Sequence, residues 1–369
     1  MIKNGLEGDS MELIKVNDRN RNQFIKFYED RYINTPIKRN SMSSLLKGLI
    51  NGKSVMCKSV DIEPLMVMDD GRIIMICVLA HAHRMPEFLQ IAFFEAIENN
   101  MDAFKLILDR TNLLAKEKGA TKISGSLNVH VNYGLGFLAG DYDKWQSFGS
   151  PHNPEFYNTL FEKNGFQTID MISFYKEINE MEPPVSSTLR DKLEKRYTVR
   201  KVNFKQLKKE AAIYTDVNNE AFKEHLFYYD RDKKEDLELF KDLRFLIKPE
   251  NLLFVERNNA PVGFMLWYPD FHKLMNPKET VGVSTVIKNR LFHNRIKTFK
   301  IVEIGVIPSE QSRGAILALF DYLYKITKGR YDSFESGWIL KENEKSLDLT
   351  LRYVDGVNKN YKAFIKDVE

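Results

Sequence analysis

The feature that most constrains the fold of this chain is a buried strand that enters an amphipathic helix through a short Gly-containing turn. Residues 299–306 read Phe-Lys-Ile-Val-Glu-Ile-Gly-Val, an apolar run that ends before Pro308. Residues 315–326 carry apolar side chains at helical spacing, directly after Gly314. A strand that leads into a helix in this way predicts a layered α/β fold.

The turn itself, residues 306–316, is typical of a phosphate-binding segment. A helix N-terminus offers unpaired amide groups and a partial positive charge, which favour an anion. Arg313 adds a positive charge, and Gly314 lets a ligand approach the backbone closely. The same residues also fit an ordinary strand-to-helix connection, and the turn alone does not separate the two interpretations.

This turn resembles the acyl-CoA pyrophosphate loop of the GNAT acyltransferase superfamily. Gln311 and Gly314 match the family pattern of Gln or Arg, two residues, Gly, one residue, then Gly or Ala. The last position departs from the pattern, because Ile316 stands there. Downstream, residues 335–343 resemble the family's next strand and the Asn that opens the following helix, and residues 353–364 resemble the helix end and final strand.

The resemblance implies that acetyl-CoA or another acyl-CoA binds at this turn as a co-substrate. Asn343 resembles the Asn near the CoA arm, although Asn is also a favoured helix cap. The implied cofactor-binding residues are Val306, Gln311, Ser312, Arg313, Gly314, Ala315, Ile316 and Asn343.

A second resemblance covers the first half of the chain. Residues 123–128, 146–149, 153–157 and 164–166 are similar, in sequence and order, to bacterial two-domain GNAT-like proteins. Together the two resemblances extend over residues 11–369. They imply a mixed α/β fold of tandem GNAT-like acyl-CoA acyltransferase domains, each a mixed, mostly antiparallel sheet flanked by helices.

Hydrophobic periodicity gives a similar order of elements in both halves. In the first half we predict strands over 12–16, 64–68, 72–80 and 89–96, helices over 22–32 and 101–118, and a strand at Ile123. In the second half we predict strands over 197–203, 252–257 and 262–268, helices over 205–222 and 232–244, and a long excursion over 269–297.

Domain boundaries follow from the break at residues 182–188, where Pro and Ser replace the apolar periodicity. The length of 369 residues suits two domains. We predict a disordered extension over 1–10, an N-terminal GNAT-like domain over 11–180, a linker over 181–195 and a C-terminal GNAT-like domain over 196–369.

The charge and the apolar content of the chain bear on whether it binds nucleic acid or membranes. The 55 basic and 51 acidic residues give a net charge of only +4 and are interspersed along the chain, so no nucleic-acid partner is expected. No apolar run reaches the length of a membrane span, and the N-terminal segment lacks the apolar core of a signal peptide. We therefore expect a cytoplasmic protein without a membrane partner.

Candidate metal ligands are few. Cys57 and Cys77 lack metal-ligand spacing and are too few for a disulfide framework. His81 and His83 project to one face of a predicted strand, but no third ligand lies nearby in the sequence. We predict no metal site.

Acyl transfer from a thioester to an amine requires a deprotonated amine, a held thioester and a proton donor for the leaving thiolate. By resemblance, Glu303 on the strand before the turn is the candidate base, and Tyr353 is the candidate acid. The alternative for Glu303 is a surface carboxylate, and for Tyr353 a buried ring with a satisfied hydroxyl. Clustered aromatics at residues 221–229 are candidates to line an acceptor pocket or to fill the core.

The leading hypothesis is an acyl-CoA-dependent N-acyltransferase, chiefly an acetyltransferase, acting on an amine of a small molecule or protein. A second hypothesis is a transferase that depends on aminoacyl-tRNA, which also uses paired GNAT-like domains; an extended basic surface or helical arm would be expected, and neither is evident. A third is a non-catalytic GNAT-fold protein in which Ile316 blocks the phosphate site.

Overall fold

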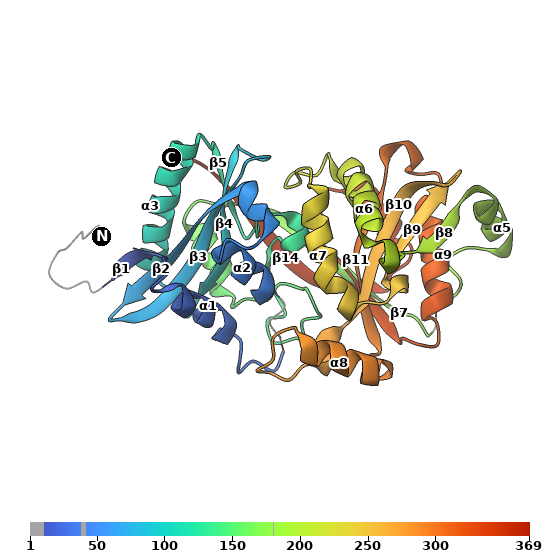
Figure 1. Ribbon diagram of the computed structural model, residues 1–369, viewed down its shortest axis with the longest axis horizontal. Helices are drawn as coiled ribbons and strands as arrows, with labels where there is room; N and C mark the ends of the chain where they lie inside the picture. The colour runs from blue at the N-terminus through green and yellow to red at the C-terminus, as the bar shows by residue number, and fades with distance from the viewer. Residues whose placement is uncertain (1–10, 38–41, 180) are drawn as a thin grey trace.

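The computed structural model of the protein describes residues 11–37, 42–179 and 181–369, and its elements follow one another in two similar series (Figure 1). We call residues 11–179 the N-half and residues 181–369 the C-half. The extension predicted over residues 1–10 lies outside the described residues.

In the N-half the elements are β1 (Glu12–Lys15), α1 (Arg21–Asp30), α2 (Ser43–Ile50), η1 (Val55–Lys58), β2 (Val60–Asp69), β3 (Arg72–Ala82), β4 (Phe88–Ala96), α3 (Met101–Lys118), β5 (Lys122–Gly125), η2 (Val131–Tyr133), β6 (Phe137–Leu138), α4 (Phe156–Lys163) and β7 (Gln167–Glu177). In the C-half they are α5 (Ser187–Arg196), β8 (Thr198–Lys201), η3 (Phe204–Gln206), α6 (Leu207–Phe222), α7 (Lys233–Leu246), η4 (Pro249–Asn251), β9 (Leu252–Arg257), β10 (Ala260–Pro269), η5 (Phe271–Leu274), α8 (Val283–Phe292), η6 (His293–Arg295), β11 (Thr298–Val306), η7 (Pro308–Glu310), α9 (Ala315–Thr327), β12 (Ser333–Ser336), β13 (Ile339–Leu340), α10 (Glu344–Leu351) and β14 (Gly356–Asp367).

Local sequence signals set several of these bounds. Asn100 caps α3 by accepting a hydrogen bond from the backbone N–H of Ala103, and Gly119 ends the same helix in the left-handed conformation with φ 71°. The hairpin of β2 and β3 turns at Asp70 and Gly71, which both have positive φ. These are positions where the sequence alone predicts the structure closely.

The described strands form one 14-stranded sheet rather than two separate sheets. The main path of the sheet is β1-β2-β3-β4-β5-β14-β7-β12-β11-β10-β9-β8, with β6 beside β14 and β13 beside β7. Most pairs are antiparallel, whereas β4–β5 and β11–β12 are parallel. The order reads the same from both ends if β1 is matched with β8, β2 with β9, and so on to β7 with β14.

The two halves exchange their last strands at the centre of this sheet. β14, from the end of the C-half, lies between β5 and β7 of the N-half, and β7 lies between β14 and β12. The β7–β14 pair is antiparallel and runs from Gly356 opposite Tyr175 to Ile365 opposite Gln167. Each half therefore completes its sheet with a strand of the other half.

Helices cover both faces of the sheet (Figure 1). In the N-half α1 and α2 pack on one face, and α3 and α4 pack on the other. In the C-half α6 and α7 pack on one face, and α5 and α9 on the other. Buried aromatic residues are distributed over all four of these cores, including Phe24, Phe104, Trp267 and Phe240.

The predicted fold class, a mixed and mostly antiparallel sheet flanked by helices, is confirmed. Several elements differ from the sequence prediction. Residues 187–196 form the helix α5 within the segment expected to be a linker, and α8 lies within the excursion predicted over 269–297. Helix α2 was not predicted at all.

Candidate functional site

Strand β11 opens away from its neighbour β12 halfway along its length. The parallel pairing runs only from Thr298 opposite Ser333 to Ile301 opposite Ser336. Beyond this point β11 continues to Val306 beside β10, while the chain after β12 leaves to form β13 against β7. The result is a wedge-shaped opening in the sheet, with the second half of β11 along one side.

A β-bulge lies at the start of this opening. Leu266 on β10 faces Glu303, but the next residue, Trp267, faces Ile301, so Val302 has no opposite residue. Bulges re-aim the side chains that follow them and are frequent beside active sites. Here the residue that follows the bulge is Glu303.

The carboxylate of Glu303 is half-buried and is held by two side chains of α6. Tyr214 donates its hydroxyl hydrogen to Oε2, and the Nδ2 group of Asn218 donates to Oε1 over 2.7 Å. Burial is the largest influence and raises the pKa of Glu303 to about 7, while both hydrogen bonds act in the opposite direction. A carboxyl group that titrates near neutral pH is suited to general-base catalysis.

Further contacts fix the orientation of these two partners. The hydroxyl of Tyr228 lies 2.6 Å from Oδ1 of Asn218, so the amide must present its Nδ2 group to Glu303. From the N-half, Nδ2 of Asn132 donates to the Tyr214 hydroxyl over 3.2 Å. The network around Glu303 thus contains residues of both halves.

A buried arginine supports the same junction. Arg231 and Asp236 form an ion pair of 2.7 Å whose side chains are both fully buried, and Arg231 also donates to the hydroxyl of Tyr133 in the N-half over 2.8 Å. Thr215 on α6 donates to Asp236. Nearby, burial lowers the pKa of His130 well below its usual value, so this ring is neutral where it contacts the backbone carbonyl of Tyr229.

The predicted phosphate turn joins β11 to α9. Gln311, Ser312 and Arg313 are exposed, and the Nε2 group of Gln311 donates to the carbonyl of Val306 over 3.2 Å. Helix α9 has Gly314 at its N-cap and no side-chain cap, so its first amide groups have no partner within the helix. This is the arrangement that an anionic group can occupy.

Gly314 is required at this position for two reasons. Its φ of 98° is unfavourable for residues with a side chain, and an added Cβ atom would lie 2.6 Å from Cδ2 of Leu193 on α5. Ile316, the residue that departs from the family pattern, is partly buried and packs against the core beneath α9. Ala315 is fully covered at the first helical position.

Glu310, which the sequence did not single out, holds the base of the turn. Its carboxylate is buried and accepts hydrogen bonds from Tyr197 over 2.8 Å and from Arg257. The Tyr197 hydroxyl also lies 3.2 Å from the carbonyl of Arg313. These contacts tie the turn to the residue between α5 and β8 and to the end of β9, and they keep the negative charge of Glu310 paired.

The remaining two predicted site residues lie outside the Glu303 network. Tyr353 follows α10 and stacks on Phe320 of α9, with 5.9 Å between the ring centroids and 17° between their planes. Asn343 caps α10, because its side chain accepts a hydrogen bond from the backbone N–H of Ser346 over 3.1 Å. Among the residues that the structure describes, no hydrogen bond joins Tyr353 or Asn343 to Glu303.

The N-half has an equivalent end of pairing between β4 and β5, with aromatic side chains packed beside it. β4 and β5 pair only from Phe88–Lys122 to Ile91–Gly125. Beyond this point Phe94 packs edge-on against Tyr157 and Phe161, with 5.0 and 5.4 Å between ring centroids.

The N-half also closes the helix terminus that follows its opening. Asn100 caps α3, and Asp102 places a negative charge in the first turn. Both features disfavour an anion at the N-terminus of this helix. The helix after the opening therefore lacks a side-chain cap in the C-half, at α9, but has one in the N-half, at α3.

The predicted histidines have separate partners. Nε2 of His81 lies 3.1 Å from the carbonyl of Pro86, and Nε2 of His83 lies 3.1 Å from Oδ1 of Asp61. Within the described ranges, no cluster of three His, Cys, Asp or Glu side chains is arranged to bind a metal ion.

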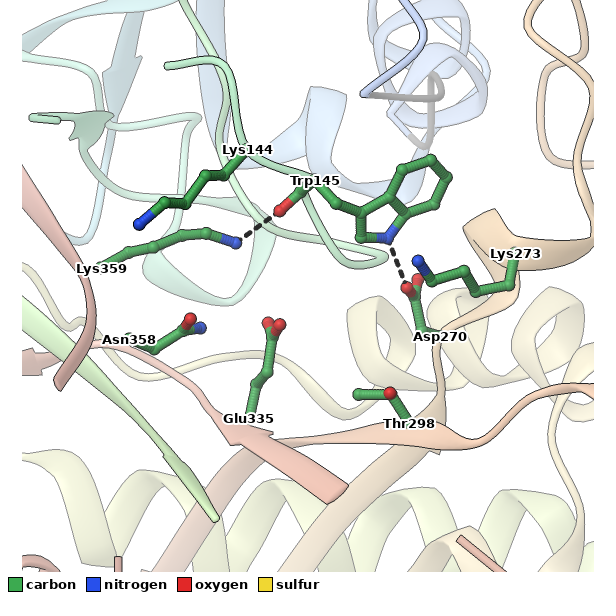
Figure 2. A pocket seen from close by; sticks show the side chains of 8 residues that line it. All are labelled: Lys144, Trp145, Asp270, Lys273, Thr298, Glu335, Asn358 and Lys359. Carbon is green, nitrogen blue, oxygen red and sulfur yellow. Dashed lines mark hydrogen bonds between the residues drawn. The ribbon is translucent and has the colours of Figure 1, made fainter. Parts of the chain in front are cut away.

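A polar cavity of about 270 Å³ lies where the halves meet, near the first residues of β11 (Figure 2). Trp145 donates to Asp270 over 2.7 Å, and Lys359 donates to the carbonyl of Trp145 over 2.6 Å. Behind the cavity wall, burial lowers the pKa of Lys300 to about 8. The cavity is lined by Lys144, Trp145, Asp270, Lys273, Thr298, Glu335, Asn358 and Lys359.

The sequence identified Glu303 and the turn but missed the residues that hold them. Tyr214 and Asn218 lie 89 and 85 residues before Glu303, and Asn132 lies in the other half. The only signal in the sequence was their spacing of four, which places them on one face of a helix. That pattern does not reveal which carboxylate they meet.

The amino-acid sequence is similar to two curated bacterial proteins. No family model matches the chain. It is 22% identical over 264 residues to Protein YghO of Escherichia coli strain K12, covering 69% of this chain and 67% of that protein. It is 21% identical over 285 residues to the bacterial ceramide synthase of Caulobacter vibrioides, covering 73% of each.

Among solved structures, the chain is similar to a tandem GNAT protein from the clavulanic acid biosynthesis pathway. The TM-score is 0.55 at 10% sequence identity, over 97% of this chain and 99% of that chain. The fold is therefore the tandem GNAT fold, as the sequence resemblance implies.

Proposed function

We propose that the protein is an acyl-CoA-dependent N-acyltransferase whose reaction takes place in the C-half. The observation that carries this proposal is Glu303, a carboxyl group with a pKa of about 7 that directly follows the bulge where β11 opens away from β12. An acyltransferase needs a base there, because an amine is largely protonated at neutral pH and must lose a proton before it attacks.

The uncapped N-terminus of α9 supports the proposal that this turn binds the CoA pyrophosphate. Its free amide groups, the αL conformation of Gly314 and the exposed charge of Arg313 suit a diphosphate. The side chain of Ile316 packs toward the core, which favours a turn that is open to a ligand. The capped and acidic start of α3 favours the C-half over the N-half as the cofactor site.

In the proposed reaction the amine nitrogen attacks the thioester carbonyl, the carbon–sulfur bond breaks and an amide forms. Glu303 takes the proton from the ammonium group, directly or through a water molecule. The leaving thiolate takes up a proton, for which Tyr353 is the proposed donor. Stacking on Phe320 holds the Tyr353 ring beside α9, the helix whose N-terminus is the proposed cofactor site.

The acceptor is proposed to be the amine of a long-chain amphiphile. This refinement rests on the relative named as a bacterial ceramide synthase, to which the chain is 21% identical. A small-molecule or protein amine is the alternative, since the tandem GNAT fold alone does not choose among acceptors.

The experiment that tests the proposal is calorimetric titration with acetyl-CoA and a long-chain acyl-CoA, followed by an amine screen that includes a sphingoid base. Arg313→Glu should weaken binding at least roughly tenfold, because it reverses the exposed charge at the turn. Lys105→Glu, an exposed site on α3, is the matched control and should have no effect. Absence of binding by either acyl-CoA would reject the enzyme in favour of a non-catalytic protein with this fold.

A further inference from the structure

Helix α8 presents the reverse of the usual amphipathic pattern. It buries the polar residues Thr285 and Asn289, and Asn289 donates to the carbonyl of Leu246 over 2.8 Å. Of its four aliphatic residues, Val286 packs against the core, whereas Val283, Ile287 and Leu291 are 76%, 52% and 67% exposed. A surface helix normally turns its apolar stripe to the core, so this orientation requires an explanation outside the core.

The three exposed residues form one continuous stripe, because a spacing of four places them on the same face of the helix. Two more apolar side chains of these helices are exposed: Phe292 at the end of α8 (39%) and Phe245 near the end of α7 (52%). A groove of about 290 Å³ between these helices includes Phe245 in its lining. A contiguous apolar surface of this kind marks an interaction site more often than a scattered leucine does.

The segment that contains α8 is basic. The segment from Lys273 to Lys297 contains six basic residues and one acidic residue, Glu279, a net charge of +5. Lys288 is paired with Glu279 over 2.7 Å, whereas Arg290 and Arg295 are exposed. The whole chain has a net charge of only +4, so the rest of the molecule has slightly more acidic than basic groups.

The arginines lie against the apolar rings rather than away from them. The guanidinium of Arg295 lies 4.5 Å from the ring centroid of Phe292, and that of Arg244 on α7 lies 4.8 Å from the ring centroid of Phe245. Arg290 lines the groove between the two helices. Apolar and cationic groups therefore lie together at α8, a helix at the edge of the molecule (Figure 1).

We propose that this α8 surface, formed by Val283, Ile287, Leu291, Phe292, Phe245, Arg244, Arg290 and Arg295, binds the surface of a bilayer that contains anionic lipid. The stripe would enter the boundary between headgroups and acyl chains, and the arginines would contact phosphate groups. None of the described helices combines the length and apolar content that crossing a bilayer requires, so the contact is with one leaflet.

A lipid surface explains the charges better than a second copy of the chain does. In a two-fold dimer the same patch lies on both partners, so the three arginines of one patch would face the same three of the other. An anionic leaflet complements the charge and covers the apolar stripe at the same time. This inference departs from the expectation, drawn from the sequence, of a protein without a membrane partner, and it does not depend on the activity proposed for Glu303.

The test is co-sedimentation of the full chain with phosphatidylcholine vesicles that contain or lack phosphatidylglycerol. We expect binding to the anionic vesicles, with roughly a tenfold or greater loss of partitioning in Ile287→Glu/Leu291→Glu. The Arg290→Glu/Arg295→Glu variant should bind anionic vesicles less than the native protein does at low salt. Rising salt should weaken the binding of the native protein to these vesicles. The control is Leu113→Glu, because Leu113 on α3 is 54% exposed and lies in the other half.

Two results would overturn the proposal. One is failure of the native protein to sediment with anionic vesicles, and the other is equal sedimentation of the native protein and the Ile287→Glu/Leu291→Glu variant. Size-exclusion chromatography of the same samples would reveal a dimer through α8, which together with absent vesicle binding would assign the stripe to a second copy. The substituted side chains are exposed, and circular dichroism checks that each variant is folded.

Discussion

At the scale of single residues, Glu303 shows how opposing effects set the pKa of a carboxyl group. Two hydrogen bonds from α6 favour the ionised form, but burial disfavours it more and raises the pKa to about 7. The ionised and neutral forms are then present in comparable amounts at neutral pH. A base with this balance can accept a proton in one step and release it in the next.

Glu303→Gln should abolish the pH dependence of the reaction along with most of its rate. In the native protein kcat/KM should rise with pH through about 7, because only the ionised carboxylate can accept a proton. The variant should lose roughly 100-fold to 10,000-fold in kcat, the usual contribution of a general base. A pH–rate profile on both proteins is the measurement; a native profile without an inflection near pH 7 would remove Glu303 from the role of base.

The same carboxyl group should make the fold less stable at high pH. Its folded pKa of about 7 exceeds the usual value of 4.5, so its contribution is fully present below pH 4.5 and is lost as pH rises through 7. Relative to the native protein, Glu303→Gln should therefore gain about 2 to 3 kcal/mol in free energy of unfolding between pH 5 and pH 8. Urea titrations of both proteins at pH 5 and pH 8 measure this difference in the free energy of unfolding.

Glu87→Gln is the control for both experiments with Glu303. Glu87 is an exposed carboxylate just before strand β4 in the N-half, outside the Glu303 network. We expect it to leave the difference in stability between pH 5 and pH 8 unchanged. A pH response in this variant equal to that of Glu303→Gln would show that the effect does not originate at Glu303.

The sequence was informative about single residues where the neighbouring residues define the environment. Glu303 was named because it lies on the strand before the turn, but period-two alternation could not show what it faces. Its pKa depends on Tyr214 and Asn218, which approach only when α6 packs on the sheet. The roles of Tyr353 as acid and of Asn343 near the CoA arm stay predictions, and the structure adds that Asn343 caps α10.

At the scale of elements, the connection from β11 to α9 depends on one glycine. Gly314 has a φ of 98°, and Leu193 on α5 lies directly above it. The segment expected to be a linker thus contributes a helix that contacts the proposed cofactor turn. Arg190 on α5 strengthens this contact with two hydrogen bonds to Asp321 on α9.

Gly314→Ala should destabilise the protein by about 1 to 3 kcal/mol, the usual cost of a strained backbone position. It should also weaken acyl-CoA binding, because the turn must rearrange. In the double variant Gly314→Ala/Leu193→Ala, the contact with the new Cβ atom is removed but the backbone strain at position 314 remains. The second substitution should therefore relieve only part of the destabilisation that Gly314→Ala causes. Thermal unfolding of each variant measures the effect.

Gly282→Ala is the matched control for that experiment, since Gly282 has an extended backbone and its nearest potential contact is 3.9 Å away. An equal effect of the two substitutions would mean that the turn does not require glycine at position 314.

The periodicity of the sequence predicted most elements, and the exceptions have physical causes. Helix α3 was predicted with the bounds that the structure shows, because Asn100 and Gly119 mark its ends. Helix α8 was missed because three of its four aliphatic residues face outward, which contradicts the pattern used to find helices. Helix α5 was missed because it is rich in charge and buries only Leu193.

At the scale of the whole molecule, strand pairing rather than the linker joins the two halves. β7 contacts β14 and β12, and both belong to the C-half. The sequence could not indicate this exchange, because each last strand is equally compatible with the sheet of its own half. Pairing between strands distant in sequence is chosen by tertiary packing.

Cutting the chain between the halves should therefore leave the molecule intact. A protease site inserted between the exposed residues Glu182 and Pro183 would sever the connection before α5. After cleavage the two pieces should co-elute in size-exclusion chromatography near 43.1 kDa and separate only in denaturant. A denaturing gel confirms that cleavage is complete, and elution as two separate species under native conditions would contradict the prediction.

The palindromic strand order also bears on descent. Matching β7 with β14 gives the symmetry of a homodimer whose subunits lent each other a terminal strand. We infer that a gene for such a subunit was duplicated and fused, after which selection no longer held both copies to the same task. The two copies now differ at the start of the helix after the opening, because α9 has no side-chain cap, whereas Asn100 caps α3 and Asp102 lies in its first turn. Two places that fusion made identical in origin were thereafter free to follow separate histories.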